Sequence, residues 1–224
     1  EWSATMTEVV QRKQARKWPR RLALGLLAFL CVFMFSMCQW AHGMVDPKTH
    51  PDLSRSLAHV LQPDGGSRAV GVLRKGIEPG QVVYIHGTPG TADNWAAYLR
   101  DPVGDVPAIA VDRLGFGAST ASGAVGSFAE QAGAIAEVIR QQAAPKPVVV
   151  GHSLGGPIAA RLAADHPDLV GGLVLVAASL DPALESPRWF NYALGFPPIG
   201  WCFPDGINFS IDEMFAAEQQ TESL

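Results

Sequence analysis

The chain has 224 residues, with 17 lysines and arginines against 21 aspartates and glutamates and a formal net charge of −4. This length suits one domain of ordinary size, and an apolar share of 48% excludes a chain that is disordered throughout. The slightly acidic balance gives no reason to expect a nucleic-acid partner, and three cysteines are too few for a disulfide framework or a cysteine-rich metal site.

The first 41 residues predict a membrane anchor. Residues 1–21 carry six basic and two acidic side chains, and residues 22–38 follow without any charge. With the next three residues, the run 22–41 holds 20 residues, about 30 Å as a helix, which matches the thickness of a hydrocarbon core. Trp18 and Trp40 flank this run, where indole rings favour the membrane interface. We therefore expect a single-pass helix in the lipid bilayer.

The charges around the apolar run predict its orientation. A basic segment that precedes a membrane helix tends to stay in the cytoplasm. Residues 1–21 are therefore expected to form a cytoplasmic head, with the body on the periplasmic or extracellular side. A cleaved secretory signal, with Ala41-His42-Gly43 as its cleavage site, is the alternative. Because the apolar part of a signal peptide is about 7–15 residues long, the length of this run favours an uncleaved anchor.

The segment 44–67 is polar and interrupted by proline and glycine, which predicts a linker with one early strand near 57–62. Beyond it lie short apolar runs rich in β-branched residues, which are typical of strands buried on both faces. These runs are 68–74, 82–85, 108–111, 148–150 and 173–176.

Helical patterns lie between the later runs. Ser127-Phe-Ala-Glu130 has the sequence of a capping box and opens an amphipathic segment that ends at Gln142. A second helix is expected over 154–164, with Pro157 in its first turn, where a missing N–H costs nothing. This alternation of strands and helices predicts a doubly wound, mostly parallel α/β sheet over 68–181.

The segment 147–156 combines a strand, a Gly-x-Ser-x-Gly motif and the start of a helix. In this arrangement Ser153 stands on a tight, strained turn, and Gly151 and Gly155 leave room for neighbouring backbone. The helix directs its N-terminus at the reaction centre, where negative charge develops. The pattern predicts that Ser153 is a nucleophile.

Two more segments directly follow predicted strands: His86-Gly-Thr-Pro-Gly90 and Asp112-Arg-Leu-Gly-Phe-Gly-Ala-Ser119. With the serine motif, and in this order, they resemble the α/β-hydrolase superfamily over residues 68–180. The resemblance is closest to its serine esterase and prolyl-aminopeptidase-like branch. The segment 112–119 is expected to be a polar turn that holds the preceding loop in place.

The resemblance implies roles for individual residues. Ser153 is the nucleophile, and the backbone N–H groups of Thr88 and Leu154 form the oxyanion hole. His86 is expected to shape its loop rather than act as a base. The remaining supporting positions are Gly87, Gly151, His152 and Gly155.

The resemblance also implies an acid and a histidine after the nucleophile. The only histidine after Ser153 is His166, thirteen residues on, which is too early for that role. Asp181 lies near an alternative acid position that some family members use. The aromatic-rich segment 182–224 looks like the family's lid. We therefore expect the C-terminal strands of the fold to be missing, which leaves the run 173–176 as an apolar sheet edge.

The sequence thus predicts a membrane-anchored serine hydrolase that cleaves ester or related acyl bonds in a small molecule, with no metal and no cofactor. Ser153 argues against an epoxide hydrolase or a dehalogenase, which would need aspartate at that position. Two alternatives stay open. One is a catalytically inactive binding or scaffold protein that keeps the serine turn. The other is an aminopeptidase-type hydrolase, because His-Gly-x-Pro-Gly occurs there too.

Overall fold

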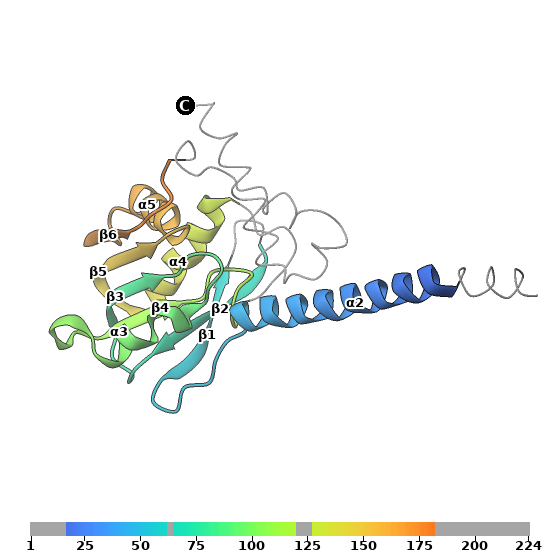
Figure 1. Cartoon of the computed structure of the whole chain (residues 1–224). Helices are drawn as coiled ribbons and strands as arrows, with labels where there is room; N and C mark the ends of the chain where they lie inside the picture. The colour runs from blue at the N-terminus through green and yellow to red at the C-terminus, as the bar shows by residue number, and fades with distance from the viewer. Residues whose placement is uncertain (1–16, 62–64, 120–126, 182–224) are drawn as a thin grey trace, which may run out of the picture. The chain divides into compact units, whose positions relative to one another are not determined.

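The computed structural model describes residues 17–61, 65–119 and 127–181 (Figure 1). The chain falls into two compact units, Glu1–Trp40 and Ala41–Leu224. The expected lid over 182–224 and most of the expected basic head lie outside the described residues.

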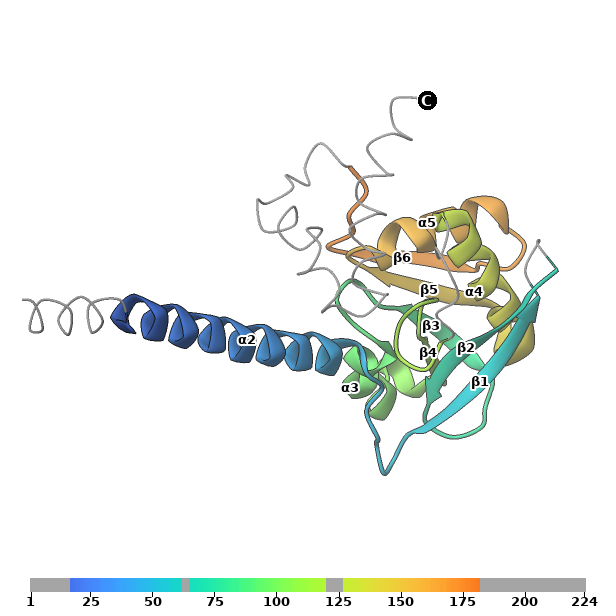
Figure 2. The ribbon, with the colours of Figure 1, turned by 90° about the vertical axis from the view of Figure 1, so that its right-hand side faces the viewer.

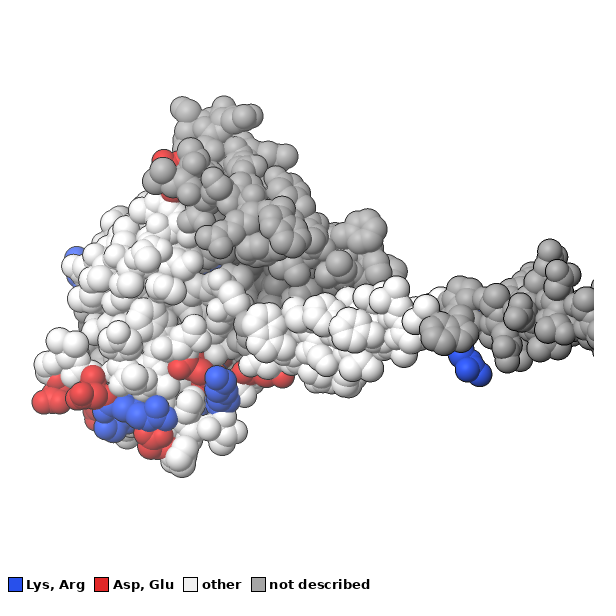
Figure 3. Space-filling model, viewed as in Figure 1, with Lys and Arg blue, Asp and Glu red and all other residues white. Residues whose placement is uncertain are grey.

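The apolar run forms helix α2, Lys17–Val45. Its stretch Arg20–Trp40 is 21 residues long, and none of its most apolar part is buried in the protein. Leucine, valine and phenylalanine side chains are exposed all along it, and Figure 3 shows charge on its visible surface only at the N-terminal end. The structure therefore confirms an apolar helix long enough to cross a membrane, a property that signal sequences share.

The body is built on a six-stranded mixed sheet with the order β1-β2-β4-β3-β5-β6. The β1–β2 and β2–β4 pairs are antiparallel, and the β4–β3, β3–β5 and β5–β6 pairs are parallel. Four of the predicted apolar runs form the parallel part of the sheet, namely 82–85, 108–111, 148–150 and 173–176. The run 68–74 lies in β2, which pairs antiparallel with both of its neighbours. The strands are Ser54–Leu61 (β1), Ser67–Arg74 (β2), Gly80–Ile85 (β3), Ala108–Val111 (β4), Ala143–His152 (β5) and Gly172–Val176 (β6).

Helices cover both faces of the sheet. Because side chains alternate along a strand, Val83 and Ile85 of β3 join one apolar cluster, and Tyr84 between them joins the other. The first cluster packs under α4 and α5, which lie side by side (Figure 2). The second packs against the segment formed by η1 and α3. The helices are α4 (Phe128–Gln142), α5 (Gly155–Asp165), η1 (Ala92–Trp95), α3 (Ala96–Arg100) and η2 (Val103–Asp105).

Two local predictions differ from the structure. Strand β1 begins at Ser54, inside the expected linker and before the expected early strand. The sequence does not reveal this start, because only Ala58 and Val60 of the strand are buried and its other side chains are polar or exposed. The predicted capping box at the start of α4 is wrong, since Ser127 is the N-cap residue but its side chain makes no cap hydrogen bond. The Ser127 carbonyl instead accepts the N–H groups of Glu130 and Gln131.

Strand β6 is the last strand of the sheet within the described residues. Its four apolar side chains, from Leu173 to Val176, are 39–45% exposed. Within the described residues β6 is thus a partly exposed apolar strand, and the expectation that the C-terminal strands of the fold are missing stays a prediction. In Figure 1 this strand lies beside β5, which leads into the serine turn.

Candidate active site

The turn between β5 and α5 holds Ser153 in a strained conformation. Its φ is +52°, in the left-handed region that non-glycine residues avoid. Its N–H donates to the carbonyl of Val176 (3.1 Å), and its carbonyl accepts the N–H of Gly156 (2.9 Å) and of Ser179 (3.1 Å). The end of β6 and the segment after it therefore hold the strained serine in place.

The glycines of the motif allow the backbones to approach closely. A Cβ on Gly151 would lie 2.4 Å from the carbonyl oxygen of Gly155. A Cβ on Gly155 would lie 2.6 Å from the carbonyl oxygens of Ile85 and His86. Any side chain at either position would push α5 away from the sheet, so this packing requires glycine.

The loop after β3 lies directly against the serine. A Cβ on Gly87 would be 2.7 Å from the Cβ of Ser153 and 3.0 Å from the carbonyl oxygen of His152. Thr88 is the next residue, and its Oγ1 accepts a hydrogen bond from the Arg113 guanidinium. The fold thus brings together the serine turn and the loop that the sequence singled out, although they lie more than 60 residues apart.

His86 is fully buried, and both of its ring nitrogens are engaged. Nε2 accepts the N–H of Arg113 (3.0 Å), and Nδ1 lies 2.7 Å from the carbonyl oxygen of Gly87. Burial, reinforced by the Arg113 charge, lowers the pKa of His86 to about 3. The ring is therefore neutral, with its proton on Nδ1, and no ring nitrogen is left to act as a base for the serine. These contacts fit a loop-shaping role.

Leu154 opens α5 immediately after the serine. Within the described part of the chain, its N–H makes no hydrogen bond, as is usual for the first N–H groups of a helix. The partial positive charge of the helix N-terminus strengthens a hydrogen bond from this N–H to a negatively charged acceptor. Leu154 can therefore offer a hydrogen bond to an anion formed beside Ser153.

His152 faces away from α5, toward the second apolar cluster. Its ring meets Trp95 edge-on at 6.3 Å, and Trp95 stacks on Tyr84 at 4.6 Å. Among the described residues, no side chain forms a hydrogen bond with the Ser153 hydroxyl. The structure therefore places His152 as packing next to the serine.

The remaining histidine and acid of the sequence analysis lie elsewhere. His166 is the C-cap of α5, at the opposite end of an 11-residue helix from Ser153. Asp181 is exposed and follows β6 by five residues. No described residue thus occupies the position of a general base. In the part of the chain that the structure covers, no group of three or more metal-ligating side chains gathers either.

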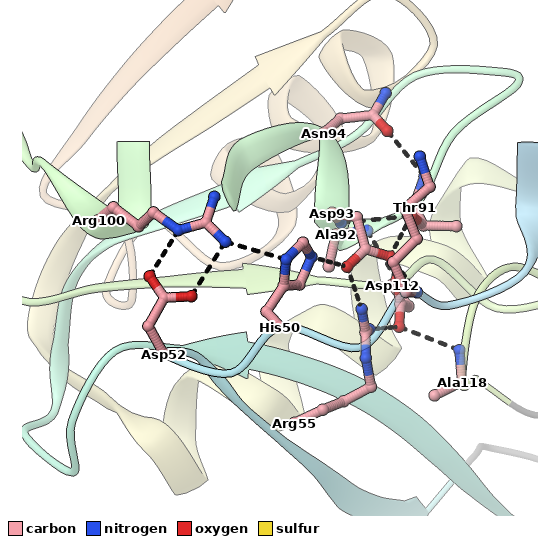
Figure 4. A network of polar contacts seen from close by, with 11 residues as sticks. His50, Asp52, Arg55, Thr91, Ala92, Asp93, Asn94, Arg100, Asp112 and Ala118 are labelled. Carbon is pink, nitrogen blue, oxygen red and sulfur yellow. Dashed lines mark hydrogen bonds and ion pairs between the residues drawn. The ribbon is translucent and has the colours of Figure 1, made fainter. Parts of the chain in front are cut away.

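The polar turn after β4 holds the loop region, as its sequence predicted. The buried carboxylate of Asp112 accepts the N–H groups of Ala92 (2.7 Å) and Ala118 (3.0 Å) (Figure 4). Ser119 Oγ donates to the Asp112 carbonyl (2.7 Å) and accepts the N–H of Gly71 (2.8 Å). Burial raises the pKa of Asp112, although the nearby Arg55 charge and the two N–H donors act in the opposite direction.

Sequence reasoning missed two members of this network, Arg55 and Asp93. Arg55 contacts Asp112 with one guanidinium nitrogen and Asp93 with another, at 2.7 Å. Burial tends to raise the pKa of Asp93, but hydrogen bonds from Lys48 N–H and from Thr91, together with the Arg55 charge, outweigh it and lower the pKa. No motif marks either residue, and only the pairing of β1 with β2 brings Arg55 to this place.

The sequence profile of the alpha/beta hydrolase fold family matches residues 80–201, more than half of the chain. The chain belongs to this family. The match includes β3, the loop after it, the turn after β4 and the serine turn, whereas Arg55 lies before the matched residues.

Relatives of known name include enzymes of acyl chemistry. The chain is 33% identical over 152 residues to the dihydrolipoyllysine-residue acetyltransferase component of the acetoin cleaving system of Cupriavidus necator. This alignment covers 67% of this chain and 34% of that protein. The chain is 42% identical over 110 residues to an esterase of Mycobacterium tuberculosis, which covers 48% of this chain and 36% of that protein. The chain therefore spans about a third of the length of these curated relatives.

Solved structures show the same fold. The structure of a thermophilic esterase matches with a TM-score of 0.53 and 31% identity, over 65% of this chain and 52% of that one. This match and the family profile agree on the alpha/beta hydrolase fold.

Proposed function

We propose that this chain carries the nucleophile and the oxyanion hole of a membrane-anchored serine hydrolase that cleaves ester or related acyl bonds in small molecules. The observation that carries the proposal is the strained Ser153 turn, at the N-terminus of α5 and in contact with Gly87. The esterase and acetyltransferase names of the relatives support acyl chemistry.

In this mechanism Ser153 Oγ attacks the acyl carbon while a base takes the hydroxyl proton. The carbonyl oxygen becomes an oxyanion and accepts the N–H groups of Thr88 and Leu154. Collapse of this intermediate breaks the bond to the leaving alcohol, which takes up the proton. Water then attacks the acyl-serine and releases the acid. The family resemblance implies that the base is a histidine held by an acid, and we expect both outside the described residues.

His86 supports the oxyanion hole through one peptide group. The carbonyl of Gly87 and the N–H of Thr88 belong to the same planar unit and point in opposite directions. Because His86 Nδ1–H holds the Gly87 carbonyl at 2.7 Å, it also sets the direction of the Thr88 N–H. A neutral, fully buried ring suits this role, since a buried imidazolium would be costly.

We also propose that α2 anchors the protein in the bilayer, with the body on the non-cytoplasmic side. The helix is long and apolar enough to cross, and the six basic residues before it favour a cytoplasmic N-terminus. The division into a head, an anchor, a linker, a hydrolase core and a lid stays a prediction.

The test is hydrolysis of p-nitrophenyl acetate, butyrate and octanoate by the detergent-extracted full-length protein. We expect hydrolysis that Ser153→Ala abolishes. Prolyl p-nitroanilide in the same panel tests the aminopeptidase alternative. Failure of the wild-type protein on every substrate would favour the scaffold alternative. Hydrolysis that survives Ser153→Ala would refute the proposed nucleophile.

A further inference from the structure

The segment between α2 and β1 is bound by polar contacts to η1, which follows the loop 86–90, here called the Gly87 loop. The carboxylate of Asp93, in η1, accepts the backbone N–H of Lys48 (3.0 Å) and contacts His50 Nε2 (2.7 Å) and Arg55 (2.7 Å). Only 4% of the Asp93 side chain is exposed. Figure 4 shows His50 and Arg55 beside the Asp93 carboxylate. The segment 48–55 is thus packed on the body through specific polar contacts.

Arg55 joins two buried carboxylates. One guanidinium nitrogen contacts Asp93 and another contacts Asp112, whose side chain is completely buried. The planar guanidinium fork suits this bridge, since it presents several donors in fixed directions.

The two carboxylates hold the downstream end of the Gly87 loop. Asp112 accepts the N–H of Ala92, two residues after Gly90. Asp93 accepts the hydroxyl of Thr91 (2.8 Å). Without Arg55, Asp93 and Asp112 would lose the guanidinium that contacts both of them, with the His50 ring still beside Asp93, and the two carboxylates would separate, take up a proton or admit water. Each of these outcomes moves the backbone at 91–93 and, with it, the loop.

We propose that Arg55 is a positioning residue for the oxyanion loop, acting through Asp112 and Ala92. The segment 48–55 is on this account a working part of the active site rather than a passive connection. This inference rests on the proposed function, since it assigns Arg55 a role in the placement of the Thr88 N–H.

The test measures kcat, KM and the melting temperature of the full-length Arg55→Gln and Arg55→Lys variants. Arg74→Gln is the matched control, because Arg74 lies on the paired strand β2 and bonds to Gln142 (2.6 Å), away from the loop. We expect Arg55→Gln to lower kcat by about 10- to 100-fold, less than the loss of a whole oxyanion donor, with KM within about twofold. Arg74→Gln is expected to change the melting temperature only.

A second change distinguishes positioning from general stability. Adding Asp93→Asn to Arg55→Gln removes the repulsion on Asp112 and should restore kcat several-fold, as a double-mutant cycle would report. Arg55→Lys keeps one charge without the fork and should give an intermediate kcat. If Arg55→Gln does not fold, the kcat of Arg55→Lys tests the proposal in its place.

A wild-type kcat in both Arg55 variants, with a lower melting temperature, would overturn the proposal and leave Arg55 a purely structural residue. Failure of the proposed function would show up separately, as hydrolysis that survives Ser153→Ala in otherwise wild-type protein.

Discussion

Replacing Gly87 by alanine tests the contact between the loop and the nucleophile. The added methyl would lie 2.7 Å from the Cβ of Ser153, whereas ordinary van der Waals contact is 3.4–4 Å. The Ser153 Cβ is fixed to a strained backbone that three hydrogen bonds hold. The methyl therefore has to move the loop rather than the serine, by about 0.7 Å, the difference between these two distances.

This displacement sets the expected size of the effect. A misplacement of about 1 Å at a catalytic group costs about 100-fold in rate, or about 2.7 kcal/mol in the barrier. We expect the Gly87→Ala variant to lose 30- to 100-fold in kcat, as a rough figure, with KM much less affected. Overpacking costs only about 1–3 kcal/mol of stability, so the protein should stay folded.

The assay compares kcat for p-nitrophenyl butyrate with the melting temperature of each variant. Gly133→Ala in α4 is the control, because a Cβ there meets nothing within 4 Å. Alanine in a helix stabilises by up to about 1 kcal/mol relative to glycine, so this variant should keep its activity and gain stability. If Gly87→Ala hydrolyses the ester within twofold of the wild-type rate, the loop does not position the oxyanion donor as described.

Two further predictions concern pH and topology. His86 has a pKa of about 3 in the folded protein and 6.5 when unperturbed. Burial and the charges of Arg113 and Arg55 lower this pKa, while the hydrogen bond to Gly87 and the charge of Asp93 raise it. Between these values the unfolded chain binds a proton that the folded state excludes, so the free energy of unfolding should fall by up to about 5 kcal/mol as pH drops from 6.5 to 3. Denaturant titrations of wild type and His86→Asn should differ in this window, and identical pH curves would contradict a neutral buried ring. A reporter fused at the C-terminus should be active only on the non-cytoplasmic side, and release of the protein by carbonate would refute the anchor.

Local sequence patterns predicted most of the scaffold. The run 108–111 has the same bounds as β4. A short apolar run between polar residues is typical of a strand buried on both faces, and the polar residues mark its two ends. The glycines around Ser153 predicted a tight turn, and the left-handed φ of this serine is the strain that such a turn stores.

Long-range polar contacts were beyond sequence reasoning. Arg55 and Asp112 lie 57 residues apart, and they meet only because β1 pairs with β2 and β2 with β4. The start of β1 was not predicted, since its exposed residues Ser54 and Ser56 look like part of a linker in the sequence. The cap of α4 failed for a related reason, because Ser127 satisfies the first turn with its carbonyl and not its hydroxyl.

The most direct test of the central claim is to treat the full-length protein with a fluorophosphonate probe and to map the adduct by mass spectrometry. The account predicts one covalent phosphonyl adduct on Ser153, absent from Ser153→Ala and retained in Gly133→Ala. An adduct on another residue, or labelling that persists in Ser153→Ala, would contradict it.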